Sequence, residues 1–263
     1  MTERTLTADS TGPVNFDATS NAADIHIAVL ASANRAQVTV TTTATSGPSH
    51  DAVQSATLTR SPGSLSATLR DEGATVVSTG YGSVTVAGRN TGVISTGSGS
   101  VVMSGGRVWV NGVEVTAAGA TGASAGPLAP ITIRATLPAG SSIDVRTRSG
   151  QVTAVGALAS ATARTTSGDI ALDRCGAANL SSVSGDLKVD AAASVAASTT
   201  SGDIRVGDVG AFTAVSVSGD VRVRDTNGAA SASTTSGDVT IGYSGPMRPV
   251  ARSVSGDVKV RPR

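Results

Sequence analysis

The sequence has a single cysteine, few aromatic residues and a net charge close to zero. Among its 263 residues there is a single cysteine, Cys175, so no disulfide can form within the chain. Aromatic residues make up 2% of the chain, which excludes a broad core built on large rings and leaves a narrow core of aliphatic and small side chains. The formal net charge of +1 excludes the strong single-sign field that attracts nucleic acid or an anionic membrane.

Long apolar runs and imidazole groups are also scarce. No apolar run reaches the length of about 18 residues that a membrane-spanning helix needs. The first residues lack the apolar stretch of a secretory signal, so we expect a cytoplasmic location. His26 lies in an alternating strand pattern and His50 in a Gly-Pro-Ser-His-Asp loop. The adjacency of His50 and Asp51 in sequence does not favour the geometry of a Ser-His-Asp site. We therefore expect no enzymatic activity and no cofactor.

A repeat dominates the C-terminal half. It is the tripeptide Ser-Gly-Asp, with Gln in place of Asp in the first copy. Subtracting successive serine positions gives spacings of 18, 17, 17, 17, 18 and 19 residues, and Gly82-Ser83-Val84 and Gly99-Ser100-Val101 form a fainter pair 17 apart. Regular spacing of this kind indicates a repeat architecture. The serines of the repeat are Ser149, Ser167, Ser184, Ser201, Ser218, Ser236 and Ser255.

Each repeat continues as an alternating strand. The first and third residues after the Asp are apolar and are expected to point inward, while the residue between them points outward. These features predict an all-β solenoid of stacked strand–turn repeats of about 17 residues. The expected inward pairs are Ile170/Leu172, Leu187/Val189, Ile204/Val206, Val221/Val223, Val239/Ile241 and Val258/Val260.

The residues before the turns alternate between two types. Thr165-Thr166, Thr199-Thr200 and Thr234-Thr235 alternate with Ser182-Val183, Ser216-Val217 and Ser253-Val254. Because stacked coils tend to place like on like, we infer that two repeats make one coil of about 34 residues. The alternatives are one repeat per coil of about 17 residues and an antiparallel meander.

The N-terminal half is less regular. Strands are expected from Asp24 to Leu30, Ala36 to Thr43, Val53 to Arg60 and Ser64 to Leu69, and a hairpin from Val108 to Val115 around Asn111-Gly112. We expect residues 1–130 to form an irregular part of the same solenoid, with a mobile loop at 117–130. Residues 131–263 then form its regular part. Leu137-Pro138-Ala139-Gly140 is the expected turn into the repeats.

The segment from Ile131 to Gly150, followed by the Ser-Gly-Asp repeats, resembles the DUF4097 family of bacterial β-strand repeat proteins. Members of that family carry the label adhesin. The resemblance covers most of the chain and implies a β-helix-like solenoid. It implies no catalytic residues.

Three sets of residues are candidates for chemistry. The repeated aspartates could bind Ca²⁺, but their spacing differs from that of calcium β-rolls, and we expect turn capping and ion pairing between coils instead. The outward residues Lys188, Arg205, Arg222 and Lys259 form a candidate interaction surface. We expect Cys175 to be a small turn or core residue. The candidate calcium ladder is Asp169, Asp186, Asp203, Asp220, Asp238 and Asp257.

These observations favour a scaffold or protein-interaction function. The partner would be another protein, or copies of this chain, bound through the face or the ends of the solenoid. The alternative is an adhesin-like cell-envelope or glycan-binding module. We expect no nucleic-acid partner because stacking aromatic residues are absent from the basic stripe.

Overall fold

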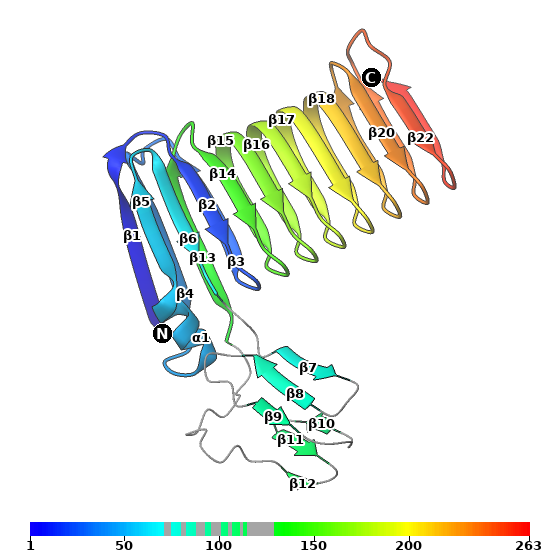
Figure 1. Ribbon diagram of the computed structural model, residues 1–263. Coiled ribbons are helices and arrows are strands. Elements are labelled where there is room, and N and C mark those ends of the chain that lie inside the picture. The colour runs from blue at the N-terminus through cyan, green and yellow to red at the C-terminus, as the bar shows by residue number, and fades with distance from the viewer. Residues whose placement is uncertain are drawn as a thin grey trace.

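The computed structural model describes residues 1–70 and 129–263, together with six short strands between these ranges, and shows an all-β solenoid (Figure 1). One 17-stranded sheet winds along the molecule, and the six short strands form two separate three-stranded antiparallel sheets, β7 to β9 and β10 to β12. The strands of the large sheet are β1 (Thr2–Thr11), β2 (Asn15–Thr19), β3 (Asp24–Leu30), β4 (Arg35–Thr42), β5 (Thr57–Ser61), β6 (Ser64–Thr68), β13 (Ile131–Pro138), β14 (Ser142–Arg146), β15 (Val152–Arg164), β16 (Ile170–Ser181), β17 (Leu187–Thr199), β18 (Ile204–Ser216), β19 (Val221–Thr226), β20 (Ala230–Thr234), β21 (Val239–Tyr243), β22 (Val250–Ser253) and β23 (Val258–Pro262). The short strands are β7 (Thr75–Thr79), β8 (Ser83–Ala87), β9 (Val93–Ser95), β10 (Val101–Ser104), β11 (Arg107–Val110) and β12 (Val113–Glu114).

Each coil of the solenoid contains one Ser-Gly-Asp repeat. β16 to β18 pair in parallel and in register, with Ile170 opposite Leu187 and Leu187 opposite Ile204, an offset of 17 residues at each step. The expectation of two repeats and about 34 residues per coil is therefore wrong, and the 17-residue alternative is confirmed. A coil consists of two strand segments joined by a bend, so the solenoid has two facing layers, each formed by stacking equivalent segments.

The core lies between these two layers. Ile170 and Leu172 from one layer are 1% and 2% exposed, and Leu180 from the other is 1% exposed. The inward orientation is confirmed in the same way for the next four repeats, through Val239 and Ile241. Because stacked aliphatic side chains fill this space, each buried Ile or Leu contributes about 1.5–3 kcal/mol to folding.

The last coil departs from the pattern. Val258 and Val260 were expected inside, but Val258 is 43% exposed and Val260 is only partly buried. The physical reason is that β23 pairs with β21 on one side and with no described strand on the other. The inward side chains of this coil are therefore covered from one side only.

The other end of the solenoid is closed by a cap. β1 pairs with β4, and β4 with β13, in the antiparallel sense, before the parallel pairing of β13 with β3 begins the stack. An ion pair of 3.0 Å between Arg60 and Asp9 joins β5 to β1. The helix α1 (Pro48–Ser55) packs on β1 and β4, and the Arg4 guanidinium donates to the Gln54 carbonyl at its end.

The cap contains most of the differences from expectation. Residues 53–55 belong to α1, so the strand expected from Val53 starts only at Thr57, and His50 lies in this helix rather than in a loop. β1 and β2 were not predicted. The other expected strands are confirmed, as are the pairing of β11 with β12 and the turn at Gly140, whose φ is +81°.

Two further expectations concern residues between the described ranges. The mobile loop expected at 117–130 lies outside the described residues up to position 128. The fainter repeat pair does not form stacked coils, because β8 and β10 belong to different antiparallel sheets. The division of the chain at residue 130 stays a prediction.

Candidate functional site

Glycine in the Ser-Gly-Asp turns allows successive coils to approach each other closely. A Cβ atom built on Gly168, Gly185 or Gly202 would lie 2.0–2.1 Å from the carbonyl oxygen of the turn glycine in the preceding coil. No side chain fits at that distance, so the stack requires glycine here. The first turn of the stack, which precedes Asp24, has Ala23 at the equivalent position.

In the first Ser-Gly-Asp turns of the stack, the side-chain hydroxyl group three residues before the turn glycine caps the turn. Thr165 Oγ1 accepts a hydrogen bond from the Gly168 N–H at 2.9 Å, and Ser182 Oγ accepts one from the Gly185 N–H at 2.7 Å. Serine and threonine thus perform the same role. This equivalence explains why their alternation does not double the length of the coil.

The aspartates link each turn to the next. Asp169 Oδ1 accepts the backbone N–H of Asp186 at 2.9 Å, and Asp186 Oδ1 accepts that of Asp203 at 2.9 Å. The same bond joins Asp203 to Asp220, Asp220 to Asp238, and Asp238 to Asp257. The described residues contain no group of three or more His, Cys, Asp or Glu placed to hold a metal ion. That the ladder does not bind calcium stays a prediction.

The predicted basic stripe is a row of outward side chains on one layer. Lys188, Arg205 and Arg222 stand opposite one another on successive strands, and Thr240 and Lys259 continue the row. Arg205 forms ion pairs with Asp186 at 2.9 Å and with Asp203 at 2.6 Å. Because these pairs are exposed to water, each contributes little to stability and can be exchanged for another carboxylate.

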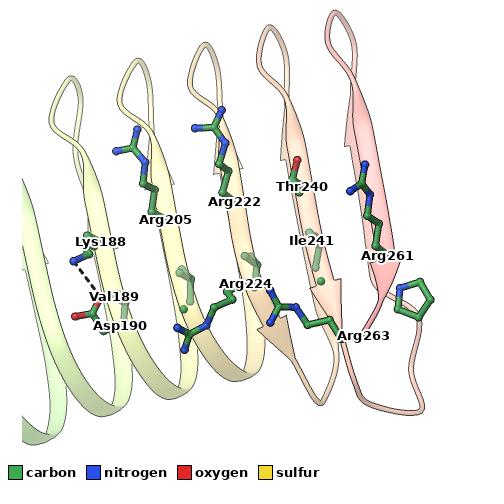
Figure 2. A pocket seen from close by; sticks show the side chains of 15 residues that line it. Lys188, Val189, Asp190, Arg205, Arg222, Arg224, Thr240, Ile241, Arg261 and Arg263 are labelled. Atoms are coloured by element: carbon green, nitrogen blue, oxygen red, sulfur yellow. Dashed lines mark ion pairs between the residues drawn. The ribbon is translucent and has the colours of Figure 1, made fainter.

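A shallow groove with a volume of about 550 Å³ lies beside this row (Figure 2). Gly207 and Gly242 also line it, and a Cβ atom at these positions would lie 2.0 Å from the Asp190 carbonyl oxygen and 2.2 Å from the Arg224 carbonyl oxygen. Six cationic side chains and one carboxylate, Asp190, line it. The cations are Lys188, Arg205, Arg222, Arg224, Arg261 and Arg263.

The cations of the groove are not equally available. Arg224 forms hydrogen bonds through Nε and Nη2 with Asp208, and this contact holds the pKa of the Asp208 carboxyl below its ordinary value. Lys188 pairs with Asp190 at 3.2 Å. Within the part of the chain that the structure describes, Arg261 and Arg263 have no ion-pair partner. The groove can therefore accept carboxylates from another molecule at these two residues without breaking an existing pair.

The sequence identified only part of this site. The structure brings Lys188, Arg205 and Arg222 into the groove, while Lys259 lies in the same row but outside the lining. Sequence reasoning missed Arg224, Arg261 and Arg263. The alternation Val-Arg-Val-Arg at 221–224 and Val-Lys-Val-Arg at 258–261 was the signal that could have revealed the first two of them, because the second basic residue also points outward.

Cys175 and the two histidines do not form a reactive centre together. Cys175 is buried in the core, and burial raises the pKa of its thiol to about 11. His26 lies on the outward face of β3, as predicted. His50 Nδ1 lies 2.6 Å from Thr2 Oγ1, which itself donates to the Ala44 carbonyl, so the histidine is the donor to Thr2 and ties α1 to β1. Among the described residues, no helix is long and apolar enough to cross a membrane.

The chain is similar to one protein family and to solved structures of low sequence identity. No curated protein matches the chain. A crystal structure of a "putative adhesin" from Bacteroides fragilis superposes with a TM-score of 0.48 at 13% identity, over 99% of this chain and 97% of that one. Another protein with the same description, from Parabacteroides merdae, gives a TM-score of 0.36 at 10% identity, over 100% and 96%. The family described as Toastrack DUF4097 matches residues 33–262, and the chain therefore belongs to the DUF4097 family.

Proposed function

We propose that this chain is a non-enzymatic interaction module that uses the groove to bind an acidic segment of a protein partner. The observation that carries the proposal is the composition of the groove, where six cationic side chains and only one carboxylate line the surface. Complementary charge gives specificity and fast association between proteins. The rigid coils hold these cations in place, so binding does not require the scaffold to rearrange.

The lining residues also argue against the other classes of function. The groove contains no histidine, cysteine or serine, and only one carboxylate, so it lacks a paired acid and base or an activated nucleophile. It contains no aromatic side chain on which a sugar ring or a nucleobase could stack. A protein segment, which presents carboxylates on a flexible extended chain, fits this lining better than a glycan does.

Calorimetry with two polyanions, oligoglutamate and a polyuronate, tests the proposal. Oligoglutamate should bind the chain, and affinity should fall as salt rises, because the contacts are exposed ion pairs. The double variant Arg222→Glu/Arg224→Glu should weaken binding at least about tenfold, since each lost charge contact is worth about 1 kcal/mol. Arg164→Glu is the matched control, because Arg164 is an exposed arginine that does not line the groove.

The outcomes separate the candidate functions. Binding of a polyuronate with no binding of oligoglutamate would favour the glycan-binding alternative. If neither ligand binds, or if Arg164→Glu reduces affinity as much as the double variant does, the groove is not the site.

A further inference from the structure

The outer edge of β23 presents unpaired backbone groups. In the preceding coil, the Val239 N–H donates to the Asp257 carbonyl at 2.9 Å, and the Tyr243 carbonyl accepts the Arg263 N–H at 2.9 Å. Backbone groups alternate in direction along a strand, so Val239, Ile241 and Tyr243 face the last coil. Their register partners are Val258, Val260 and Pro262. These three therefore face away from the stack, where no described strand pairs with them.

Two features that repeat in the earlier coils, the aspartate hydrogen bond and the burial of inward valines, are missing at the edge of β23 in the part of the chain that the structure describes. Each aspartate from Asp169 to Asp238 gives its Oδ1 to a backbone N–H of the following coil, but Asp257 Oδ1 has no such donor among the described residues. Val258 is 43% exposed and Val250 is 52% exposed, whereas Val239 in the coil below is fully buried. The edge thus offers hydrogen bonds, one carboxylate acceptor and a shallow apolar strip to an extended chain.

Charge indicates which chain the edge accepts. Residues 244–263 contain five cations and one carboxylate, a net charge of +4, although the whole chain has a net charge of only +1. A second copy brought edge to edge would place like charges side by side, which is unfavourable. An acidic strand would gain the opposite-charge contacts instead. The cations are Arg248, Arg252, Lys259, Arg261 and Arg263.

We propose that an extended acidic segment of a partner protein adds to the edge of β23 as a further parallel strand. Its apolar residues lie beside Val258 and Val260, and its acidic residues lie beside Lys259 and Arg261. A backbone N–H at the start of the segment donates to Asp257 Oδ1, as in every earlier coil of the ladder. Pro262 removes one donor from the edge but leaves its carbonyl, so the cations and the proline select among strands rather than block pairing.

This edge is a site distinct from the groove, although Arg261 contributes to both. Val258 and Lys259 do not line the groove, whereas Arg224 does. The two sites can therefore be tested separately. A variant at Lys259 reports on the edge, and a variant at Arg224 reports on the groove.

The experiment uses fluorescence anisotropy at low salt with three labelled peptides. The acidic peptide is Ser-Gly-Asp-Val-Glu-Val-Glu, which places glutamates beside Lys259 and Arg261. The second peptide has lysine in place of both glutamates, and the third carries a methyl group on the backbone nitrogen of both glutamates, which lie in register with Lys259 and Arg261. We expect saturable binding of the acidic peptide, affinity about tenfold lower for the lysine peptide, and no binding of the N-methylated peptide, which cannot donate to the Val258 and Val260 carbonyls.

A charge exchange provides the decisive control. Lys259→Glu should weaken binding of the acidic peptide and strengthen binding of the lysine peptide, each about fivefold, because the variant inverts the charge beside the added strand. Arg224→Glu should leave acidic-peptide binding within about twofold, even if it abolishes oligoglutamate binding in the groove. Equal binding of all three peptides, no binding of any, or no response to Lys259→Glu would overturn the proposal. A concentration-dependent dimer that the acidic peptide does not dissociate would assign the edge to a second copy instead.

Discussion

Replacing Gly202 by alanine places a methyl group against the turn of the preceding coil. The new Cβ would lie 2.1 Å from the Gly185 carbonyl oxygen and 2.6 Å from its carbon. Real Cβ atoms do not approach backbone this closely, so the two turns must separate by roughly an ångström. The φ of Gly202 lies outside the left-handed region, so close approach is the reason for glycine here.

The cost can be worked out from the hydrogen bonds that depend on this spacing. Separation weakens the Thr200 N–H bond to the Val183 carbonyl, at 3.2 Å, and the Asp203 N–H bond to Asp186 Oδ1, at 2.9 Å. It also weakens the Ser201 N–H bond to the Val183 carbonyl, at 2.8 Å. At a net contribution of about 0.5–1.5 kcal/mol each, the loss is about 2–4 kcal/mol.

Urea unfolding followed by circular dichroism measures this loss. Gly63→Ala is the matched control, because Gly63 has a φ of +72° and open space around its Cβ, so its cost of about 1–2 kcal/mol arises from backbone conformation alone. Ser201→Ala, in the same turn as Gly202, should change stability by less than about 0.5 kcal/mol. If Gly202→Ala costs no more than Gly63→Ala, the argument from coil spacing is wrong.

Three further predictions concern single groups. The pKa of Asp17 is raised, first by burial and second by the charge of Asp144, so its ionised form destabilises the fold above the unfolded-state pKa near 3.8. Asp17→Asn should therefore raise the melting temperature at neutral pH, with the gain vanishing below about pH 3.8; a gain that persists in acid would contradict this cause. Cys175 should react with a thiol reagent at least about a hundredfold more slowly in the native protein than in urea, because the thiol is buried with a pKa of about 11; equal rates would show an open core. Calcium at millimolar concentration should neither release heat in calorimetry nor raise the melting temperature, because the ladder aspartates already accept backbone hydrogen bonds; clear binding lost in Asp203→Asn would instead support a calcium site.

The repeat region was readily predicted because local pattern and stacking specify the same structure. Alternation placed Ile204 and Val206 inside, and the Ser-Gly-Asp spacing set the register of β17, β18 and β19. The error in coil length came from treating serine and threonine as different units. Their hydroxyl groups accept the same glycine N–H, so the stack does not distinguish them.

The cap was harder to predict because its contacts join distant parts of the sequence. β13 lies between β3 and β4, with Ile133 opposite Ile25 on one side and Val40 on the other. No local pattern reveals such a pairing. The helix α1 has only eight residues and begins with Pro48 after Gly47, so Val53 was assigned to the strand that follows.

Half of the cations that line the groove were predicted from the sequence. The first row of cations followed from alternation, but the groove beside it also includes Arg261 and Arg263 of the last coil, which join the lining only when β21 and β23 pair in register.

The way in which the cap incorporates β13 has a consequence for the order of folding on the ribosome. β4 lacks one of its two neighbours until residues 131–138 have been synthesised, so the cap cannot close before then. Afterwards each coil needs only the coil before it, because parallel pairing joins adjacent repeats. At about 5–20 residues per second, a new 17-residue coil emerges roughly every one to three seconds. The solenoid therefore extends from a completed cap by one coil at a time, and the most recently synthesised strand always forms its unpaired edge.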